Sequence, residues 1–360
     1  MTDPAATPQS LIYPADKLVG FATQILFAAG LGERKADAVA RILVDGDLMG
    51  HDTHGLALLA PYLGAIEART MQVEGEPEIV ADAPAAVTWD GRRLPGPWLV
   101  LKAMDLAAGR AQKFGTGTVV IRRSHHIACL AAYLKRATDR GLLMILACSD
   151  PASASVAPFG GLDPVFTPNP LAAGIPTGNL PVLIDISTSA TTNGLTRRLH
   201  TEGGRLPAPW VIDSNGQATD DPSVLFSTPA GTILPLGGLD SGHKGYGLTL
   251  LVEALTGGLA GHGRADANEG WGATVFLQII DPRAFAGLDA FTHQTDTVTR
   301  QCRQSRPSKA GTTVRTPGER GLERATYQLQ AGVALHPSIA PMLEPWAQKL
   351  GVPFPAPVQG

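Results

Sequence analysis

The sequence predicts an α/β protein, in which a sheet-containing core is flanked by helical segments. Between about residues 78 and 280, short runs of β-branched and apolar residues alternate with longer segments of helical periodicity. Such alternation is typical of a mostly buried sheet covered by helices. Toward both ends of the chain, apolar residues recur at helical spacing only. The chain of 360 residues also exceeds the ~250–300 residues at which one core usually stops growing, so more than one lobe is expected.

This pattern divides the chain into three expected segments. Residues 1–78 would form an N-terminal helical domain that carries a histidine-containing turn. Residues 79–320 would form the α/β core, and residues 321–360 would form C-terminal helices that pack back on the N-terminal domain.

Helical periodicity defines the elements of the two ends. Leu18, Phe21 and Ile25 share one face, and Gly30 follows as a stop signal. A second helix is predicted over residues 33–49, and residues 50–55 read as a turn before a third helix. The predicted helices of the two ends cover residues 18–29, 33–49, 56–69, 322–335 and 339–350.

Strands and helices alternate in the expected core. The predicted strands cover residues 86–89, 118–121, 143–147, 182–186 and 274–280. The predicted helices cover residues 99–114, 128–140 and 247–259. Residues 149–181 are rich in Gly and Pro, and a loop of that length inside a compact domain is generally functional.

Composition argues against several classes of protein. The net charge of −3 and the lack of a basic stripe with aromatics disfavour nucleic-acid and anionic-membrane binding. The N-terminal residues do not resemble a secretory signal, and the longest apolar run, Leu142–Cys148, is far below the ~20 residues of a bilayer span. We therefore expect a soluble, cytoplasmic protein without a membrane partner. The three cysteines show no CxxC spacing, which disfavours a disulfide framework or a thiolate zinc site.

Glycine-rich and nucleophile motifs with strict spacing are incomplete. Gly115-Thr-Gly117 precedes a predicted strand, and Gly245-Tyr-Gly247 lacks a third glycine, so a Rossmann turn is not supported. The sequence has no P-loop, no HExxH and no GxSxG motif. Chemistry must therefore come from less regular clusters.

The first cluster is the turn from His51 to Gly55. A histidine in a turn between helices can present its ring to a cleft as a general acid, since the ordinary pKa of imidazole is about 6.5. The simpler interpretation is a surface turn in which Asp52 or Thr53 caps a helix. A zinc site from His51 and His54 is a further alternative, although the sequence offers no evident third ligand.

The second cluster, Ser124-His125-His126, follows the predicted strand 118–121, where α/β proteins place ligand sites. The simpler interpretation is that one histidine caps the next helix and the other faces solvent. A third, dispersed set includes glycine-rich turns and a lysine that could hold phosphates. These segments lie at residues 157–161, 169–170, 185–189, 243–247 and 317–320.

Taken in order, these clusters resemble the malate/L-lactate dehydrogenase family of the non-Rossmann type, over about Leu18 to Leu350. That family includes sulfolactate and ureidoglycolate dehydrogenases and reductases of piperideine- and pyrroline-carboxylates. Its D-S-H-G motif appears as Asp52 to Gly55, its S-N-H-F-G as Ser124 to Ala128, and its D-M-(A/S)-T-S as Asp185 to Ser189. A-P-F-G-G, H-K-G-Y-G-L and P-G-E are intact at residues 157–161, 243–248 and 317–319.

The resemblance implies a non-Rossmann malate/L-lactate (sulfolactate) dehydrogenase-like α/β fold and a homodimer. It implies NADPH or NADH as cofactor, with NADPH favoured, and hydride transfer to a small molecule. His54 would donate the proton, with His126 and Asp185 as further catalytic residues. The cofactor-binding residues would be His126, Ser149, Asp185, Ile186, Ser187, Lys244, Gly318, Glu319 and Arg320. No metal is expected.

This chain departs from the family pattern in the expected substrate pocket, which comprises Thr53, Leu58, Pro168 and Asn169. Four residues after the histidine the family usually has an arginine that binds the substrate carboxylate, and here that residue is Leu58. Leucine cannot replace a bidentate guanidinium. We therefore expect a C=N or C=O substrate that is small, cyclic and not anchored by that arginine.

Three alternatives remain open from the sequence. The first is a 2-hydroxy or 2-keto acid dehydrogenase of the malate/lactate type. The second is a catalytically silent protein that binds the cofactor and has lost turnover. The third is a metal-dependent hydrolase that uses His51, His54 and His126.

Overall fold

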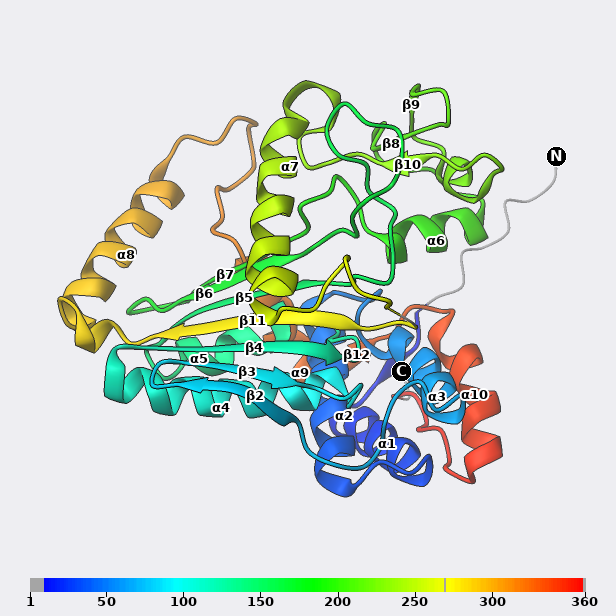
Figure 1. The fold of residues 1–360 in the computed structure, drawn as a ribbon, viewed down its shortest axis with the longest axis horizontal. Coiled ribbons are helices and arrows are strands. Elements are labelled where there is room, and N and C mark those ends of the chain that lie inside the picture. The colour runs from blue at the N-terminus through cyan, green and yellow to red at the C-terminus, as the bar shows by residue number, and fades with distance from the viewer. Residues whose placement is uncertain (1–9, 269, 359–360) are drawn as a thin grey trace. The chain divides into compact units, whose positions relative to one another are not determined.

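The computed structural model describes residues 10–268 and 270–358 and divides into two compact units. Unit 1 combines Met1–Glu74 with Arg320–Gly360, and unit 2 is Gly75–Glu319. Figure 1 shows the elements of both units by label.

Unit 1 is helical. Two short strands, β1 (Ile12–Tyr13) and β12 (Val333–Ala334), pair antiparallel and join its N- and C-terminal parts. Gly50, with a φ of 89°, ends α2 in the left-handed conformation that glycine adopts without strain. The ring of Phe354 packs edge-on against Tyr13 and Phe21. The helices are α1 (Ala15–Ala28), α2 (Glu33–Met49), η1 (Leu56–Leu58), α3 (Leu59–Glu67), α9 (Glu319–Ala331) and α10 (Ile339–Leu350).

Unit 2 is built on a seven-stranded sheet in the order β2-β3-β4-β11-β5-β6-β7. The strands are β2 (Glu78–Ala83), β3 (Ala86–Asp90), β4 (Thr116–Ser124), β5 (Leu143–Ser149), β6 (Leu171–Ile175), β7 (Val182–Ile186) and β11 (Ala273–Ile280). Strands β3 and β4 pair in parallel, whereas β11 runs antiparallel to both β4 and β5. Strand β6 runs antiparallel to β5 and β7. Strands β3, β4, β5 and β7 therefore share one direction, and their carboxyl ends lie at one edge of the sheet.

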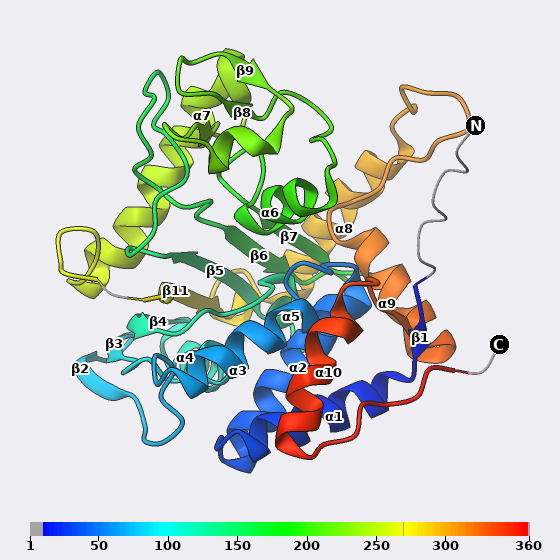
Figure 2. The ribbon, with the colours of Figure 1, turned by 90° about the vertical axis from the view of Figure 1, so that its right-hand side faces the viewer.

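Helices cover both faces of this sheet, as Figures 1 and 2 show. Helices α4 (Gly96–Phe114) and α5 (Ala131–Thr138) lie on one face, and α7 (Gly238–Glu253) lies on the other. Below α7, Val120, Ala147 and Phe276 from three adjacent strands pack against Val252 and Ala260. Burial of both faces explains why the central strands are almost continuously apolar.

A smaller layer lies on the α7 side of unit 2. It contains a three-stranded sheet in the order β10-β8-β9 and a separate apolar cluster around Val211 and Ile233. Its elements are α6 (Asn193–Glu202), β8 (Val211–Ile212), β9 (Ala218–Thr219), η2 (Pro222–Phe226) and β10 (Thr232–Ile233). The remaining elements are the π-helical η3 (Ala254–Gly258), η4 (Pro282–Ala284) and α8 (Leu288–Gln304).

Most predicted elements are present, and several predictions were wrong in part. The helix expected over 322–335 ends at Ala331, because Gly332 has a φ of 93°, and Val333–Ala334 forms strand β12 instead. The helix expected over 128–140 begins only at Ala131, because Ala128 has a φ of 59° and cannot continue a helix. The helix expected over 247–259 starts earlier, at Gly238, and ends in the π-helical turn. The Gly- and Pro-rich span 149–181 contains strand β6. None of the helices within residues 10–268 and 270–358 combines the length and apolar character that a bilayer span requires.

Candidate active site

Five predicted site residues from unit 2 lie at or just beyond one edge of the sheet. Ser149 is the last residue of β5, and Asp185 and Ile186 are the last two of β7. Ser187 follows β7, and His126 follows β4 by two residues. Because β4, β5 and β7 run in the same direction, the sheet brings these residues to the edge where α/β proteins bind ligands.

The His126 ring is held by its own loop. Its Nδ1 accepts a hydrogen bond from the backbone N–H of Ala128 at 3.2 Å, so in the neutral ring the proton is on Nε2. The indole of Trp271 stacks on the same ring, with 4.5 Å between centroids and 29° between planes. His126 therefore has a defined orientation and tautomer.

His125 has a different environment from its neighbour. Its side chain is fully buried and meets Trp271 edge-on. Burial lowers the pKa of His125 from 6.5 to about 3, and the nearby charge of Arg93 acts in the same direction. His125 is thus a neutral core residue and is not the histidine that the simpler interpretation places in solvent.

The Asp185 carboxylate lies at the start of α5. Its Oδ2 accepts a hydrogen bond from the backbone N–H of Ala131 at 2.8 Å, and the Cys129 thiol lies 3.8 Å from the same oxygen. A carboxylate at a helix N-terminus is stabilised by the unpaired backbone N–H groups and the helix dipole. The geometry therefore fixes the Asp185 carboxyl group at the sheet edge.

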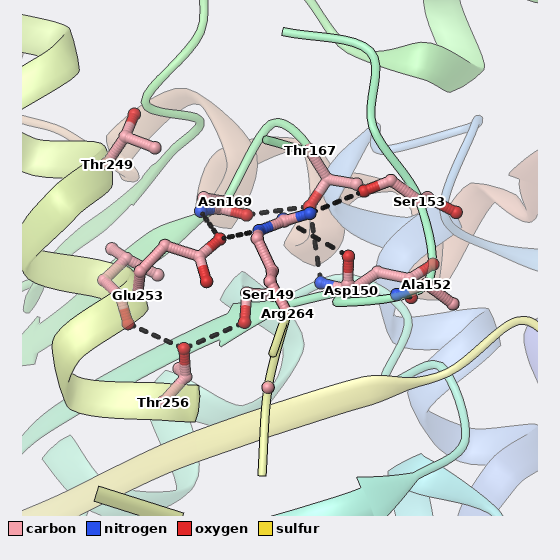
Figure 3. A network of polar contacts seen from close by, with 12 residues as sticks. Ser149, Asp150, Ala152, Ser153, Thr167, Asn169, Thr249, Glu253, Thr256 and Arg264 are labelled. Carbon is pink, nitrogen blue, oxygen red and sulfur yellow. Dashed lines mark hydrogen bonds and ion pairs between the residues drawn. The ribbon is translucent and has the colours of Figure 1, made fainter. Parts of the chain in front are cut away.

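Behind these residues, a network of polar contacts joins three loops to α7 (Figure 3). The Glu253 carboxylate at the end of α7 accepts hydrogen bonds from Asn169 Nδ2 and from Arg264 Nε, both at 2.8 Å. Asn169 Oδ1 accepts from the Thr167 hydroxyl at 2.7 Å. The fully buried Asn169 amide, predicted to line the substrate pocket, thus has both its ends engaged in the network.

Arg264 completes this network from the glycine-rich segment after η3. Its guanidinium donates to the carbonyl oxygens of Ser153 at 2.8 Å and Asp150 at 3.3 Å. One side chain thereby connects the loop after β5 to the end of α7. Pro168, also predicted to line the substrate pocket, directly precedes Asn169 in the chain. Asn169 has a φ of 42°, which is unusual for a non-glycine residue.

Ser149 is tied to the π-helical turn. Its hydroxyl is 2.9 Å from the Thr256 hydroxyl, which itself donates to the Val252 carbonyl at 2.7 Å. Since Thr256 has one hydroxyl proton, Ser149 must donate to Thr256. Ser149 can therefore offer only acceptor lone pairs to a ligand.

The A-P-F-G-G motif at 157–161 and the H-K-G-Y-G-L motif at 243–248 contact each other. A Cβ on Gly245 would lie 2.4 Å from the Leu236 carbonyl oxygen, and one on Gly242 would lie 2.9 Å from the Phe159 ring. The Phe159 and His243 rings meet edge-on at 5.8 Å. These glycines serve close packing, while the Lys244 side chain is exposed on α7.

The P-G-E motif contacts strand β7. Gly318 has a φ of 85°, and a Cβ there would lie 2.6 Å from Leu183 Cβ. The Glu319 carboxylate accepts hydrogen bonds from the Thr316 backbone N–H and hydroxyl and from Arg303, which lower the pKa of Glu319. Arg320 is exposed and belongs to unit 1.

The His54 turn belongs to unit 1. The His54 backbone N–H donates to the His51 carbonyl at 2.8 Å, and the Thr53 hydroxyl lies 2.9 Å from His54 Nδ1. Leu58, at the end of η1, is half-buried, and its N–H donates to the Gly55 carbonyl at 3.0 Å. The structure thus places Thr53, His54 and Leu58 within one short turn.

Sequence reasoning missed four residues of these arrangements. Glu253, Arg264 and Trp271 have no motif, and only the fold brings them to Asn169 and His126. Asp47 accepts a hydrogen bond from the Leu56 N–H at the end of the His54 turn, and its sequence signal is its place four residues after Leu43, on one face of the helix predicted over 33–49.

Comparisons with known proteins show the family of this chain. The family model described as malate/L-lactate dehydrogenase matches residues 13–344. Malate dehydrogenase of Pyrococcus abyssi is 30% identical over 347 residues, which cover 94% of this chain and 95% of that protein. The match confirms the family predicted from the motifs.

Solved structures give the same fold. The crystal structure of malate dehydrogenase from Entamoeba histolytica has a TM-score of 0.90 and 26% identity, and the match covers 97% of this chain and 100% of that one. The structure of Δ1-piperideine-2-carboxylate reductase from Pseudomonas syringae pv. tomato has a TM-score of 0.82 at 24% identity, with 94% and 100% covered. The predicted fold class is therefore confirmed.

Replacement of Glu253 tests the network of Figure 3. Glu253→Leu leaves the Asn169 amide and the Arg264 guanidinium without their shared acceptor and should lower the free energy of unfolding by about 2–4 kcal/mol. Glu253→Gln keeps one acceptor oxygen and should lower the free energy of unfolding by less than half as much as Glu253→Leu. Urea unfolding measures both, with Asp139→Asn in an exposed ion pair as a control that changes stability by no more than about 1 kcal/mol. Equal stability of Glu253→Leu and wild type would contradict the assignment.

His125 should make stability depend on pH. Its folded-state pKa of about 3 lies below its ordinary 6.5, so the unfolded chain binds a proton that the folded chain does not. The contribution of His125 to the free energy of unfolding is complete above pH 6.5. It decreases as the pH falls toward 3, by up to about 1.4 kcal/mol per pH unit. His125→Phe should remove this dependence in urea unfolding at about pH 5 and about pH 7.5. The exposed His293→Gln serves as control, and an unchanged slope in His125→Phe would refute the prediction.

Proposed function

This chain belongs to the malate/L-lactate dehydrogenase family and is a pyridine-nucleotide-dependent oxidoreductase, and we propose that it reduces a C=N or C=O bond of a small, cyclic substrate. The main support for this proposal is that His126, Ser149, Asp185 and Ser187 lie together at one edge of the sheet in a member of this family. We further propose that NADPH is favoured over NADH, and that the protein acts as a homodimer in the cytoplasm.

The donors and acceptors of unit 2 fit a pyridine nucleotide. The exposed Lys244 ammonium is suited to a phosphate, and the exposed Ile186 offers an apolar surface to a ring. Ser149 offers an acceptor for an amide or hydroxyl group, whereas His126 Nε2–H offers a donor. We propose that the cofactor is bound by His126, Ser149, Asp185, Ile186, Ser187, Lys244, Gly318, Glu319 and Arg320.

The bound nicotinamide would supply the hydride. Hydride addition leaves negative charge on oxygen, or a basic nitrogen, that a nearby acid must protonate. We assign this proton to His54, because an imidazole can both give and regain a proton and the Thr53 hydroxyl, 2.9 Å from Nδ1, helps to orient the ring. Asp185, fixed at the start of α5, would support the proton relay, and His126 would orient the reacting groups.

The substrate class follows from Leu58. It lies one 3-10 turn beyond His54, where the family usually has a guanidinium for the substrate carboxylate. A half-buried leucine favours an uncharged part of the substrate at this position. We therefore propose a cyclic imine or ketone that is not anchored there by a carboxylate.

A 2-keto or 2-hydroxy acid is the second candidate substrate. The named malate dehydrogenase relatives favour it, and unit 1 offers another guanidinium near the turn. A Cβ built on Gly50 would lie 2.7 Å from Arg324 Nη1, so this side chain covers the start of the turn. Arg324 is therefore the cation to test if keto acids prove to be good substrates.

Replacement of His54 tests the proton donor. His54→Gln should lower kcat/KM for reduction by about 10²–10⁴-fold and remove the decline in rate that accompanies imidazole deprotonation. Titration with NADPH and NADH, followed by nicotinamide fluorescence, should show cofactor binding unchanged. His293→Gln, at an exposed position of α8, is the control and should retain activity. Full activity of His54→Gln would refute the assignment, and wild-type binding without turnover of any substrate would favour the silent accessory protein.

Restoring the arginine tests the substrate class. Leu58→Arg should raise kcat/KM for small 2-keto acids by at least about tenfold and lower it for neutral cyclic imines, since a guanidinium pairs with a carboxylate. Both are measured as loss of nicotinamide absorbance, with Leu58→Met as a volume-matched control. If wild type already reduces keto acids efficiently, the neutral-substrate proposal fails, and Arg324→Leu then shows whether Arg324 is the anchor.

A further inference from the structure

One carboxyl group of unit 1 is buried where a charge is costly. Asp47 lies in the last turn of α2 and is only 3% exposed. Its Oδ2 accepts a hydrogen bond from the backbone N–H of Leu56 at 2.7 Å. Nine residues separate the two partners, and the turn that contains His54 lies between them. The bond therefore closes a loop around His54.

Gly55 makes this approach of the carboxyl group feasible. A Cβ on Gly55 would lie 2.2 Å from Asp47 Oδ1 and 2.3 Å from its carboxyl carbon. Any other residue at position 55 would displace the Asp47 side chain or the turn. The glycine after His54 thus has a defined physical purpose, which is to let the carboxyl group reach Leu56.

The other end of the turn is held by backbone contacts. The His51 N–H donates to the Gly46 carbonyl at 2.8 Å, and Gly50 takes the left-handed conformation. Gln328 Nε2 donates to the carbonyl oxygens of Asp47 and Leu48, at 3.1 and 2.9 Å. Helix α2 therefore ends on a fixed support, and the Asp47 side chain ties the far side of the turn to it.

We propose that Asp47 is a positioning residue for His54, which it holds in place through the hydrogen bond to Leu56 N–H and the close contact with Gly55. This rests on the proposed role of His54 as proton donor. A turn fixed at one end only would let the imidazole move by an ångström or more, and displacements of about 1 Å can cost 10²-fold in rate. Asp47 thereby contributes to catalysis without contact with the reacting atoms.

The required chemistry is an acceptor oxygen, not a charge. Burial raises the pKa of Asp47 to about 8, the neighbouring Asp52 acts in the same direction, and the Leu56 N–H and Arg324 oppose the shift. At neutral pH the group is therefore mostly a neutral carboxylic acid, whose carbonyl oxygen still accepts the hydrogen bond. Asparagine offers the same carbonyl oxygen and a similar shape.

Three variants of the full-length protein test the proposal. Asp47→Ala should lower kcat by about 10²-fold, while the dissociation constant for NADPH stays that of wild type. Gly55→Ala should reproduce this loss from the other side of the contact. Asp47→Asn should restore kcat close to the wild-type value. Hydrogen exchange of the peptide over residues 50–58 should be faster in the first two variants and protected in the third.

Asp37→Asn, an exposed carboxylate on the same helix that pairs with Arg41, is the matched control and should match wild type in every readout. The proposal would be overturned if Asp47→Ala kept both the wild-type kcat and the wild-type protection from hydrogen exchange. It would also be overturned if Asp47→Ala exchanged faster but kept its kcat, while His54→Gln was inactive. An active His54→Gln would instead refute the proton donor, and exchange would still decide whether Asp47 holds the turn. If Asp47→Ala does not fold, the comparison of Gly55→Ala with Asp47→Asn tests the proposal. Equal kcat values in these two variants would overturn it.

Discussion

The organisation of unit 2 depends on one topological constraint, the insertion of β11 and β6 antiparallel between strands that share a direction. Strand β11 separates β4 from β5, and β6 separates β5 from β7, so the carboxyl ends of β4, β5 and β7 still coincide at one edge. The amino ends of β11 and β6 lie at that edge as well. Residues that directly precede an antiparallel strand, such as Trp271 before β11 and Asn169 before β6, therefore lie at the same edge as the residues that follow β4, β5 and β7. There Trp271 stacks on His126, and Asn169 hydrogen-bonds to Glu253.

Such an edge creates loops whose backbone groups need partners. The loop after β5 has carbonyl groups that no sheet neighbour can satisfy, and Arg264 binds two of them. A guanidinium suits this task because its fixed, forked donors contact several acceptors at once. Its charge is balanced by Glu253, which also orders Asn169. The polar network of Figure 3 thus replaces regular secondary structure beneath the proposed cofactor residues.

The sequence predicted those features that repeat locally or belong to a motif. Helix α2 has the predicted bounds because it buries apolar residues at helical period, and strand β7 because it is a short apolar run that begins directly after Pro181. Strand β6 escaped prediction because only five residues lie between Pro170 and Pro176. Helix α8 escaped because it is mostly polar and exposed. Glu253, Arg264 and Trp271 could not be predicted, because their contacts exist only once distant segments have met.

The His54 turn shows why one motif can preserve its geometry while its substrate changes. The contacts that hold the turn involve Asp47, Gly50, Gly55 and the backbone of Leu56, and none of them uses the side chain of residue 58. Position 58 can therefore exchange an arginine for a leucine without disturbing the support of the histidine. Under the proposed function the exchange acts on the substrate, because burying an unpaired carboxylate there would cost several kcal/mol, roughly what a lost ion pair inside a protein costs. Support of the proposed proton donor and the proposed recognition of the substrate thus fall to separate side chains of one short segment.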